Sequence, residues 1–288
     1  MAPTIGVFDS GFGGLTVLRS LIQRLPGARF AFLGDTARLP YGSKSRRTIA
    51  RYAAQSAQFL VNEQGAEFLV IACNTASALA LDAIQEAVSV PVLGVIEPGA
   101  AAARAASQSG DVFVAATEAT VHSNAYTNAC AAHGLRVIEK ACPLLVPLVE
   151  EGWTDHPVTA EVIEIYLNEL RAEAETRNMS PDTLVLGCTH YPLLRPLFEG
   201  AVRPGAKVID SAESVAQAAL GVINGRAGCP ILSESVPAES ESVGAIQNLP
   251  SGPEVRCFAT DSIEKFQRLG SRFLGRPVGQ VELVDLGG

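Results

Sequence analysis

The stretch TLVLGCTHYP, residues 183–192, decides the fold. Its hydrophobic run ends on Cys188, and a threonine, a histidine, a tyrosine and a proline follow. Residues 68–76, FLVIACNTA, repeat the arrangement with Cys73 in the same place. Short runs that are apolar on both faces and lead into a segment of helical period are typical of strands buried inside an α/β sheet. Each stretch therefore predicts a buried strand that delivers a thiol to the start of a helix.

The rest of the chain continues this alternation of strand and helix. Apolar runs predict strands at 4–9, 29–35, 67–73, 90–96, 111–117, 135–141, 183–188, 206–210 and 254–260. Segments of helical period lie between most of them, as at 15–25, 46–64, 75–88 and 159–174. We expect an α/β fold of two similar, doubly wound parallel-sheet domains that face each other across a cleft. Residues 228–254, rich in Ser, Pro, Glu and Gly, predict a long surface loop.

The composition is that of a globular protein with a sizeable core. The chain has 288 residues, of which 48% are hydrophobic, and a net charge of −8. This charge disfavours contact with nucleic acid or with an anionic membrane surface. No apolar run reaches the roughly 18 residues that cross a bilayer, and the N-terminal stretch MAPTIGVFDS does not resemble a signal peptide. We expect a cytoplasmic protein that binds neither nucleic acid nor membranes.

The six cysteines are scattered along the chain and include no C-x-x-C pair. This spacing indicates neither a zinc ribbon nor a disulfide framework. No His, Asp or Glu cluster has the spacing of metal ligands, and no lysine lies in a cofactor motif, so we expect no metal and no cofactor. Most free cysteines are small buried residues, and we interpret Cys130, Cys142, Cys229 and Cys257 as structural.

Polar residues gather where the predicted strands end, which is the edge at which parallel α/β sheets bind ligands. They are Asp9, Ser10, Asp35, Thr36, Cys73, Asn74, Thr75, Glu97, Thr117, Cys188, Thr189 and His190. The glycine-rich turn DSGFGGL (9–15) lacks the spacing of a dinucleotide fingerprint or a P-loop. It is either a helix N-terminus that binds a carboxylate or a tight turn closed by Asp9 or Ser10 as N-cap.

Two cysteines in matching positions point to one kind of chemistry. A helix N-terminus favours the thiolate and lowers the pKa of a thiol from its usual value of about 8.5. A nucleophilic enzyme needs one thiol and a base, and a redox pair needs adjacent thiols. Two thiols on separate lobes instead suit proton transfer at both faces of one carbon, with Asp9 assisting one thiol and His190 the other. The alternative is that both cysteines simply pack in the core.

Several longer motifs resemble the glutamate racemases, a family of the aspartate/glutamate racemase superfamily. The matching stretches are IGVFDSGFGGLTVL, FLGDTARLPYG, VIACNTASA, PVLGVIEPG, ATEATVHSNAY, CPLLVPLVEEG and LVLGCTHYPLLRP. They follow the family's order through most of residues 4–210, and the resemblance weakens beyond about residue 212. It implies cofactor-independent interconversion of L- and D-glutamate, which supplies D-glutamate for peptidoglycan synthesis and thus for cell-wall biogenesis and cell shape.

The resemblance also implies roles for individual residues. Cys73 matches the thiol that takes the Cα proton from D-glutamate, and Cys188 matches the thiol that acts on L-glutamate. Asp9, His190 and Glu150 match the polar residues that assist the thiols. Substrate contacts are implied for Asp9, Ser10, Tyr41, Gly42, Asn74, Thr75, Thr117, Thr120, Thr189 and His190.

The family's organisation implies that residues 1–97 with 210–288 form the first lobe and residues 98–209 the second. Family members often form homodimers, so a homodimer is possible for this chain as well.

Two residues favour glutamate among the substrates of the superfamily. Aspartate-specific relatives carry an acidic residue after the second Cys–Thr pair, where this chain has His190, and Ser77 after CNTA is also glutamate-like. Two alternatives stay open. One is a racemase of aspartate or another amino acid on the same scaffold, and the other is a non-catalytic family member that binds an amino acid. The intact pair of Cys73 and Cys188 argues against lost catalysis.

Overall fold

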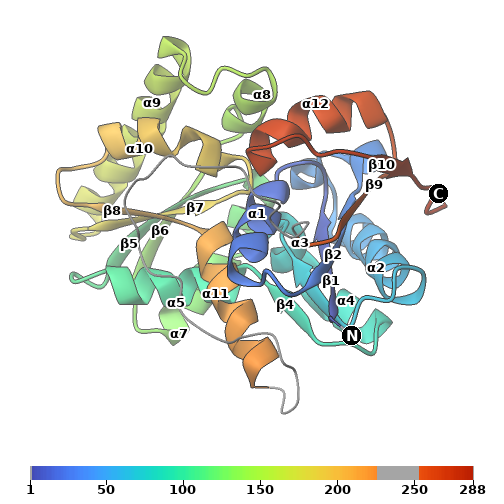
Figure 1. Ribbon diagram of the computed structural model, residues 1–288. Helices are drawn as coiled ribbons and strands as arrows, with labels where there is room; N and C mark the ends of the chain where they lie inside the picture. Colours follow the sequence, from blue (N-terminus) through green and yellow to red (C-terminus); the bar gives the residue numbers. More distant parts are fainter. Residues whose placement is uncertain (1, 226–252, 288) are drawn as a thin grey trace, which may run out of the picture.

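The computed structural model describes residues 2–225 and 253–287, which form two parallel β-sheets (Figure 1). Within these ranges one sheet has the strand order β10–β9–β2–β1–β3–β4, and the other has the order β6–β5–β7–β8. Every pairing in both sheets is parallel. The strands are β1 (Thr4–Asp9), β2 (Arg29–Gly34), β3 (Phe68–Ile71), β4 (Val92–Gly94), β5 (Asp111–Ala116), β6 (Arg136–Ala141), β7 (Thr183–Gly187), β8 (Lys207–Asp210), β9 (Val255–Ala259) and β10 (Val281–Leu283). The predicted α/β class with two parallel-sheet domains is confirmed.

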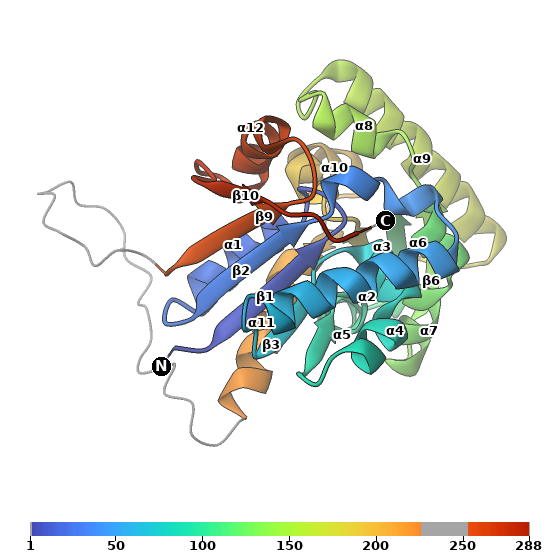
Figure 2. The same ribbon diagram turned by 90° about the vertical axis from the view of Figure 1, so that its right-hand side faces the viewer.

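Helices connect the parallel strands and cover the sheets, as two views at right angles show (Figures 1 and 2). The α-helices are α1 (Leu15–Arg24), α2 (Arg46–Asn62), α3 (Asn74–Leu79), α4 (Leu81–Ala87), α5 (Ile96–Ala106), α6 (Glu118–His122), α7 (Ala125–Ala132), α8 (Leu145–Glu150), α9 (Pro157–Thr176), α10 (Arg195–Ala201), α11 (Ser211–Asn224) and α12 (Ile263–Leu274). The described residues also form the 3₁₀ helices η1 (Thr36–Arg38), η2 (Tyr41–Ser43) and η3 (Tyr191–Leu194). None of the helices in the described ranges is both long and apolar enough to cross a membrane.

The central strands are buried on both faces, which explains their uninterrupted apolar sequences. In β1, Val7 packs into a cluster with Leu18 of α1, whereas its neighbour Phe8 packs on the opposite face with Leu60 of α2. Successive side chains of a strand point to opposite faces, so both must be apolar when helices cover both. Burying each large apolar side chain contributes about 1.5–3 kcal/mol.

The two sheets share a core. The cluster of buried side chains that holds Val7 also includes Leu184 and Leu186 of β7 and Val215 of α11. Helices α1 and α11 lie side by side between the sheets (Figure 1). Packed apolar side chains therefore hold the two sheets together.

The chain returns to the six-stranded sheet near its C-terminus. Strand β9 pairs with β2, and β10 extends the same sheet from β9. This position agrees with the strand–helix pattern that the sequence shows from 255 onward. The predicted loop at 228–254, with Cys229, lies almost entirely outside the described residues. The lobe boundaries at 97 and 210 stay a prediction.

Three local features differ from the expected elements. The helix expected at 75–88 is divided at Ala80, whose φ of −136° and ψ of 4° leave the helical region, so α3 ends at Leu79 and α4 begins at Leu81 and packs against α2. No α-helix begins at Cys188, because the 3₁₀ helix η3 intervenes before α10. Strand β10 was not predicted, because three residues are too few to show an alternating pattern.

Candidate active site

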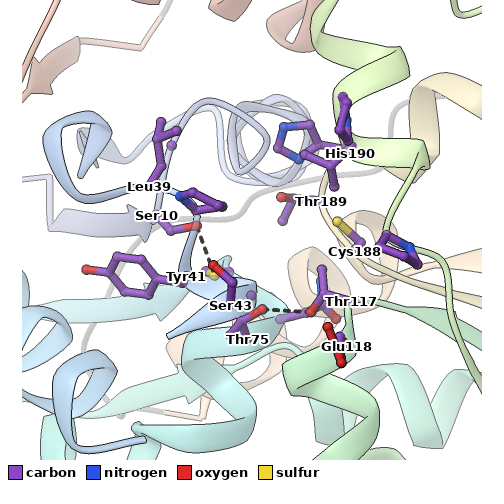
Figure 3. Close-up of a pocket in the computed structure, with 18 of the residues that line it drawn as sticks. Ser10, Leu39, Tyr41, Ser43, Thr75, Thr117, Glu118, Cys188, Thr189 and His190 are labelled. Atoms are coloured by element: carbon purple, nitrogen blue, oxygen red, sulfur yellow. Dashed lines mark hydrogen bonds between the residues drawn. The ribbon is translucent and has the colours of Figure 1, made fainter. Parts of the chain in front are cut away.

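The carboxyl ends of the two sheets enclose a cavity of about 230 Å³. All the residues that the family resemblance implied for the site line it, except Asp9 and Thr120, which lie directly behind the wall. In Figure 3, Ser10 and Tyr41 approach from one side, and Cys188 and Thr189 approach from the other. The structure thus brings both strand-end cysteines to one small cavity.

Cys73 follows β3 and caps the N-terminus of α3. Its sulfur accepts the Ala76 backbone N–H at 3.4 Å, and its thiol donates to Ser10 Oγ at 3.3 Å. Burial and the charge of Asp9 raise the pKa of Cys73 to about 11, although the hydrogen bonds from Ser10 and Ala76 lower it. The expectation that the helix N-terminus lowers the pKa of Cys73 is therefore wrong, because the pKa is raised overall. The loss of hydration raises the pKa of this thiol more than the N-terminus of the short helix α3 lowers it.

Cys188 follows β7 and is only 5% exposed. Burial raises its pKa well above the usual range, against a hydrogen bond from the His190 backbone N–H, and the charges of Cys73 and Asp9 add to the rise. A thiol with a raised pKa is seldom ionised near neutral pH, but its thiolate is a strong base. Both thiols are therefore suited to exchanging a proton with a weak carbon acid.

Asp9 ends β1 with its carboxyl group buried behind the cavity wall. Oδ2 accepts the Gly11 backbone N–H at 3.1 Å, whereas Oδ1 has no hydrogen-bond partner among the described residues. Burial raises the pKa of Asp9, and the charge of His190 and the N–H groups of Gly14, Gly11 and Ser10 lower it. A buried acceptor without a partner is costly, so this oxygen is suited to a donor supplied by a bound molecule.

His190 and Glu150 form a pair on the second lobe. His190 Nε2 lies 3.3 Å from Glu150 Oε1, and Glu150 Oε2 lies 3.6 Å from Lys265 Nζ. Burial alone would raise the pKa of Glu150. The hydrogen bond and charge of His190, together with Lys265, outweigh it and lower that pKa. The His190 ring therefore contacts a carboxylate beside the cavity.

Hydroxyl and amide groups line the cavity near α3. Thr75 Oγ1 lies 3.0 Å from Thr117 Oγ1 and 3.3 Å from Thr120 Oγ1, and these last two oxygens are 2.9 Å apart. Three hydroxyls in a closed ring can each donate to the next, and any of them can turn to donate to an anion. Asn74 is held by Tyr126, whose hydroxyl donates to Asn74 Oδ1 at 2.7 Å. These hydroxyl and amide groups are suited to donating hydrogen bonds to an anion, although the Glu118 side chain also lines the cavity beside Thr117.

Tyr41 lines the cavity, but its hydroxyl points away from Cys188 (Figure 3). It donates to Asp35 Oδ2 at 2.6 Å, and Asp35 Oδ1 accepts from Thr260 Oγ1 at 2.9 Å. Any contact from Tyr41 to a ligand would come from its ring or backbone. Asp35, Thr36 and Glu97 also end or follow strands, but they do not line the cavity.

The glycine-rich turn has a packing role. Helix α1 is capped by Gly14 with no side-chain hydrogen bond, so neither Asp9 nor Ser10 is its N-cap. A Cβ atom on Gly13 would lie 2.2 Å from Thr189 Oγ1 and 2.7 Å from His190 Nδ1. Glycine is needed here because the turn of one lobe packs directly on the Thr189–His190 segment of the other.

Other cavity residues were not predicted for the site. Cys142, assigned above to packing, lines the wall together with Val146 and Pro147 on the α8 side and Leu39 and Pro40 on the other. The sequence could have indicated Cys142, Val146 and Pro147 as site residues, because they belong to the motif CPLLVPLVEEG, which matches the family along its whole length. In the described ranges, no three His, Cys, Asp or Glu side chains are grouped so as to hold a metal ion.

Two parallel-sheet lobes that each place a thiol in one cavity define a class of proteins suited to acid–base chemistry on a small molecule. The family described as Asp/Glu/Hydantoin racemase matches residues 5–219, and the chain belongs to this family. The resemblance noted in the sequence is confirmed.

Relatives match over nearly the whole chain. The chain is 54% identical to the glutamate racemase of Koribacter versatilis (strain Ellin345), over 99% of this chain and 98% of the relative. It is similar in structure to the glutamate racemase isoform RacE1 of Bacillus anthracis, with a TM-score of 0.83, 34% identity and coverage of 99% and 98%. The Francisella tularensis glutamate racemase in complex with D-glutamate has a TM-score of 0.82, 33% identity and the same coverage.

Proposed function

We propose that this protein interconverts L- and D-glutamate by two-thiol acid–base catalysis without a cofactor. The observation that carries the proposal is the cavity shared by Cys73, from the end of β3, and Cys188, from the end of β7. The names of its relatives, and the D-glutamate bound in the Francisella tularensis structure, support glutamate as the substrate.

In the proposed reaction, the Cys73 thiolate removes the Cα proton of D-glutamate, and the Cys188 thiol then protonates the opposite face of the resulting carbanion. The reverse direction exchanges these roles. The raised thiol pKa values bring each sulfur closer in basicity to the carbon acid. Hydroxyl and amide dipoles around α3, fixed before the substrate arrives, would stabilise the negative charge that develops on the substrate carboxylate.

The surrounding groups would bind the substrate's charges. Asp9 Oδ1, buried and unpaired among the described residues, is suited to accept a hydrogen bond from the ammonium group. Ser10, Asn74, Thr189 and the ring of Thr75, Thr117 and Thr120 would donate to the carboxylates. His190, with Glu150, would assist the Cys188 thiol. Tyr41 and Gly42 would shape the wall.

The biological role follows from the same substrate. We propose that the enzyme supplies D-glutamate for peptidoglycan, and so for cell-wall biogenesis and cell shape, in the cytoplasm. We also propose that residues 1–97 with 210–288 form one lobe and 98–209 the other, and that a homodimer forms.

The test is racemisation in deuterium oxide, followed by circular dichroism and by mass spectrometry of each glutamate enantiomer. We expect either enantiomer to give a product of opposite hand that carries Cα deuterium, without added pyridoxal phosphate. Cys73→Ala and Cys188→Ala should each lower kcat by at least about 1000-fold. Exchange confined to the starting enantiomer, or full activity in both variants, would contradict the mechanism.

Aspartate serves as the comparison substrate in the same assay. Faster turnover of aspartate than of glutamate would favour the alternative of an aspartate racemase on this scaffold. Tight binding of glutamate with no turnover would favour a non-catalytic amino-acid-binding protein.

A further inference from the structure

Helix α12 contacts the second half of the site from an unexpected direction. It follows β9 of the six-stranded sheet, yet Lys265 Nζ lies 3.6 Å from Oε2 of Glu150, which ends α8. Eight residues further on, the Phe273 ring packs edge-to-face with the His190 ring, with centroids 5.0 Å apart and planes at 73°. Both members of the His190–Glu150 pair are therefore touched by one helix of the other sheet.

A third contact fixes the same helix beside α8. Gly152 lies just beyond α8 with a φ of +83°, and a Cβ atom there would lie 2.4 Å from Arg272 Nη1. The Arg272 guanidinium thus lies directly against the backbone that follows Glu150. Helix α12 and α8 are neighbours in Figure 1 as well.

Lys265 is itself held in place. Its Nζ lies 5.5 Å from the centre of the Phe12 ring, a geometry in which the ring attracts a cation. Phe12 is fully buried and packs edge-on against Phe266 of α12, at 5.9 Å. The lysine side chain is 41% exposed, so water screens its charge only in part.

The Glu150 carboxylate is shared between two partners. Oε1 faces His190 Nε2, and Oε2 faces Lys265 Nζ. A carboxylate with one partner on each oxygen has its plane fixed, whereas one with a single partner can rotate away. Fixing Glu150 also fixes the imidazole ring, which Phe273 supports from another side.

We infer that Lys265 is a positioning residue, which acts through Glu150 on His190 and so mainly on the Cys188 thiol. This inference rests on the proposed racemase function and adds a residue to the groups that assist the Cys188 thiol. The Cys73 thiol has Ser10 and Ala76 as its own hydrogen-bond partners. His190 acts on Cys73 only through the charge of Asp9, so proton transfer at Cys73 depends much less on α12. The role of Lys265 should therefore be unequal between the two faces of the substrate.

Values of kcat/KM alone cannot reveal this inequality. Enantiomers have equal free energies, so kcat/KM must be the same in both directions for any variant. Primary isotope effects with glutamate deuterated at Cα do distinguish the proton-transfer step at Cys188 from the one at Cys73. When the Cys188 step slows, deuteron removal from L-glutamate becomes more limiting and its isotope effect grows. Deuteron removal from D-glutamate by Cys73 becomes less limiting, and its isotope effect shrinks.

The experiment compares Lys265→Met with Arg268→Met, which removes a like charge from an exposed position on the same helix. We expect Lys265→Met to lower kcat/KM about fivefold, as for a partly exposed ion pair, while Arg268→Met stays at the wild-type value. The isotope effect should rise for L-glutamate and fall for D-glutamate only in Lys265→Met. Lys265→Arg, which keeps the charge, should restore both values. Unchanged isotope effects in Lys265→Met would overturn the inference.

A double-mutant cycle tests the route through Glu150. In a Glu150→Gln background, Lys265→Met should have no further effect, because the shared partner is already neutral. Two fully additive losses would overturn the inference. Failure of the proposed function is distinguishable, because a wild-type protein that does not racemise glutamate shows no isotope effect to compare.

Discussion

At the residue scale, the two thiols are controlled by burial more than by their helices. Cys73 caps α3 and accepts a backbone N–H, yet its pKa rises to about 11 because burial and Asp9 oppose the thiolate. The cavity alone, before substrate binds, therefore keeps the thiol protonated. The positive charge of a bound ammonium group would favour the thiolate, so we expect ionisation to accompany binding.

This pKa can be measured by alkylation with iodoacetamide, with mass spectrometry of the Cys73 peptide. A thiol with a raised pKa is far from fully ionised at neutral pH, so the rate should rise about tenfold per pH unit from about pH 7 to 10. Free cysteine is the control and should level off above its pKa of about 8.5. Asp9→Asn should move the profile to lower pH, because the charge of Asp9 raises the pKa of Cys73. A plateau below about pH 9 in the wild type would refute the raised value.

The sequence identified both cysteines because each interrupts an apolar run at a predictable place. It could not give their pKa values, since these depend on how fully the second lobe covers them. Lys265 and Phe273 carry no motif, and they reach Glu150 and His190 only through the packing of α12 across the sheets. Contacts between such distant parts of a chain leave no local pattern to detect.

At the element scale, the turn between β1 and α1 determines how closely the lobes approach. Gly13 packs on Thr189 and His190, and no space remains for a side chain. The sequence showed a glycine-rich turn and left open whether it binds a carboxylate or is a tight turn closed by Asp9 or Ser10 as N-cap, because glycine suits both. The division of the predicted helix at Ala80 was hidden for a similar reason. Alanine favours a continuous helix but can also occupy the position between two helices, so Ala80 gives no indication of the break.

Substitution Gly13→Ala tests this turn. A methyl group 2.2 Å from Thr189 Oγ1 must displace the Thr189–His190 segment, and a shift of about 1 Å in an active site costs on the order of 100-fold in rate. Overpacking should also lower the free energy of unfolding by about 1–3 kcal/mol. Gly200→Ala in α10, where a Cβ meets nothing within 4 Å, is the matched control and should keep wild-type activity and stability. Steady-state kinetics and thermal unfolding measure both effects, and full activity in Gly13→Ala would show that the close contact is not needed.

At the scale of the whole molecule, two lobes with a common core enclose the candidate site. The alternation of strands and helices was enough to predict two parallel sheets, because strands buried on both faces have distinctive sequences. The shared core was not predictable in the same way. Val7 and Leu184 belong to one buried cluster although nothing in either sequence stretch indicates its partner.

The last prediction concerns the coupling of the two lobes by substrate. In the double variant Cys73→Ala/Cys188→Ala, each glutamate enantiomer can be added without turnover. A ligand at about 100 times its Kd stabilises the folded state by about 2.7 kcal/mol, which should raise the Tm by roughly 5 °C for a chain of this size. Since cavity residues come from both sheets, hydrogen exchange should slow at the same ligand concentration in peptides that contain Thr75 and in peptides that contain Thr189. Protection of only one of these strand ends would mean that glutamate is held by a single lobe, and the acid–base mechanism across the cavity would then lose its geometric basis.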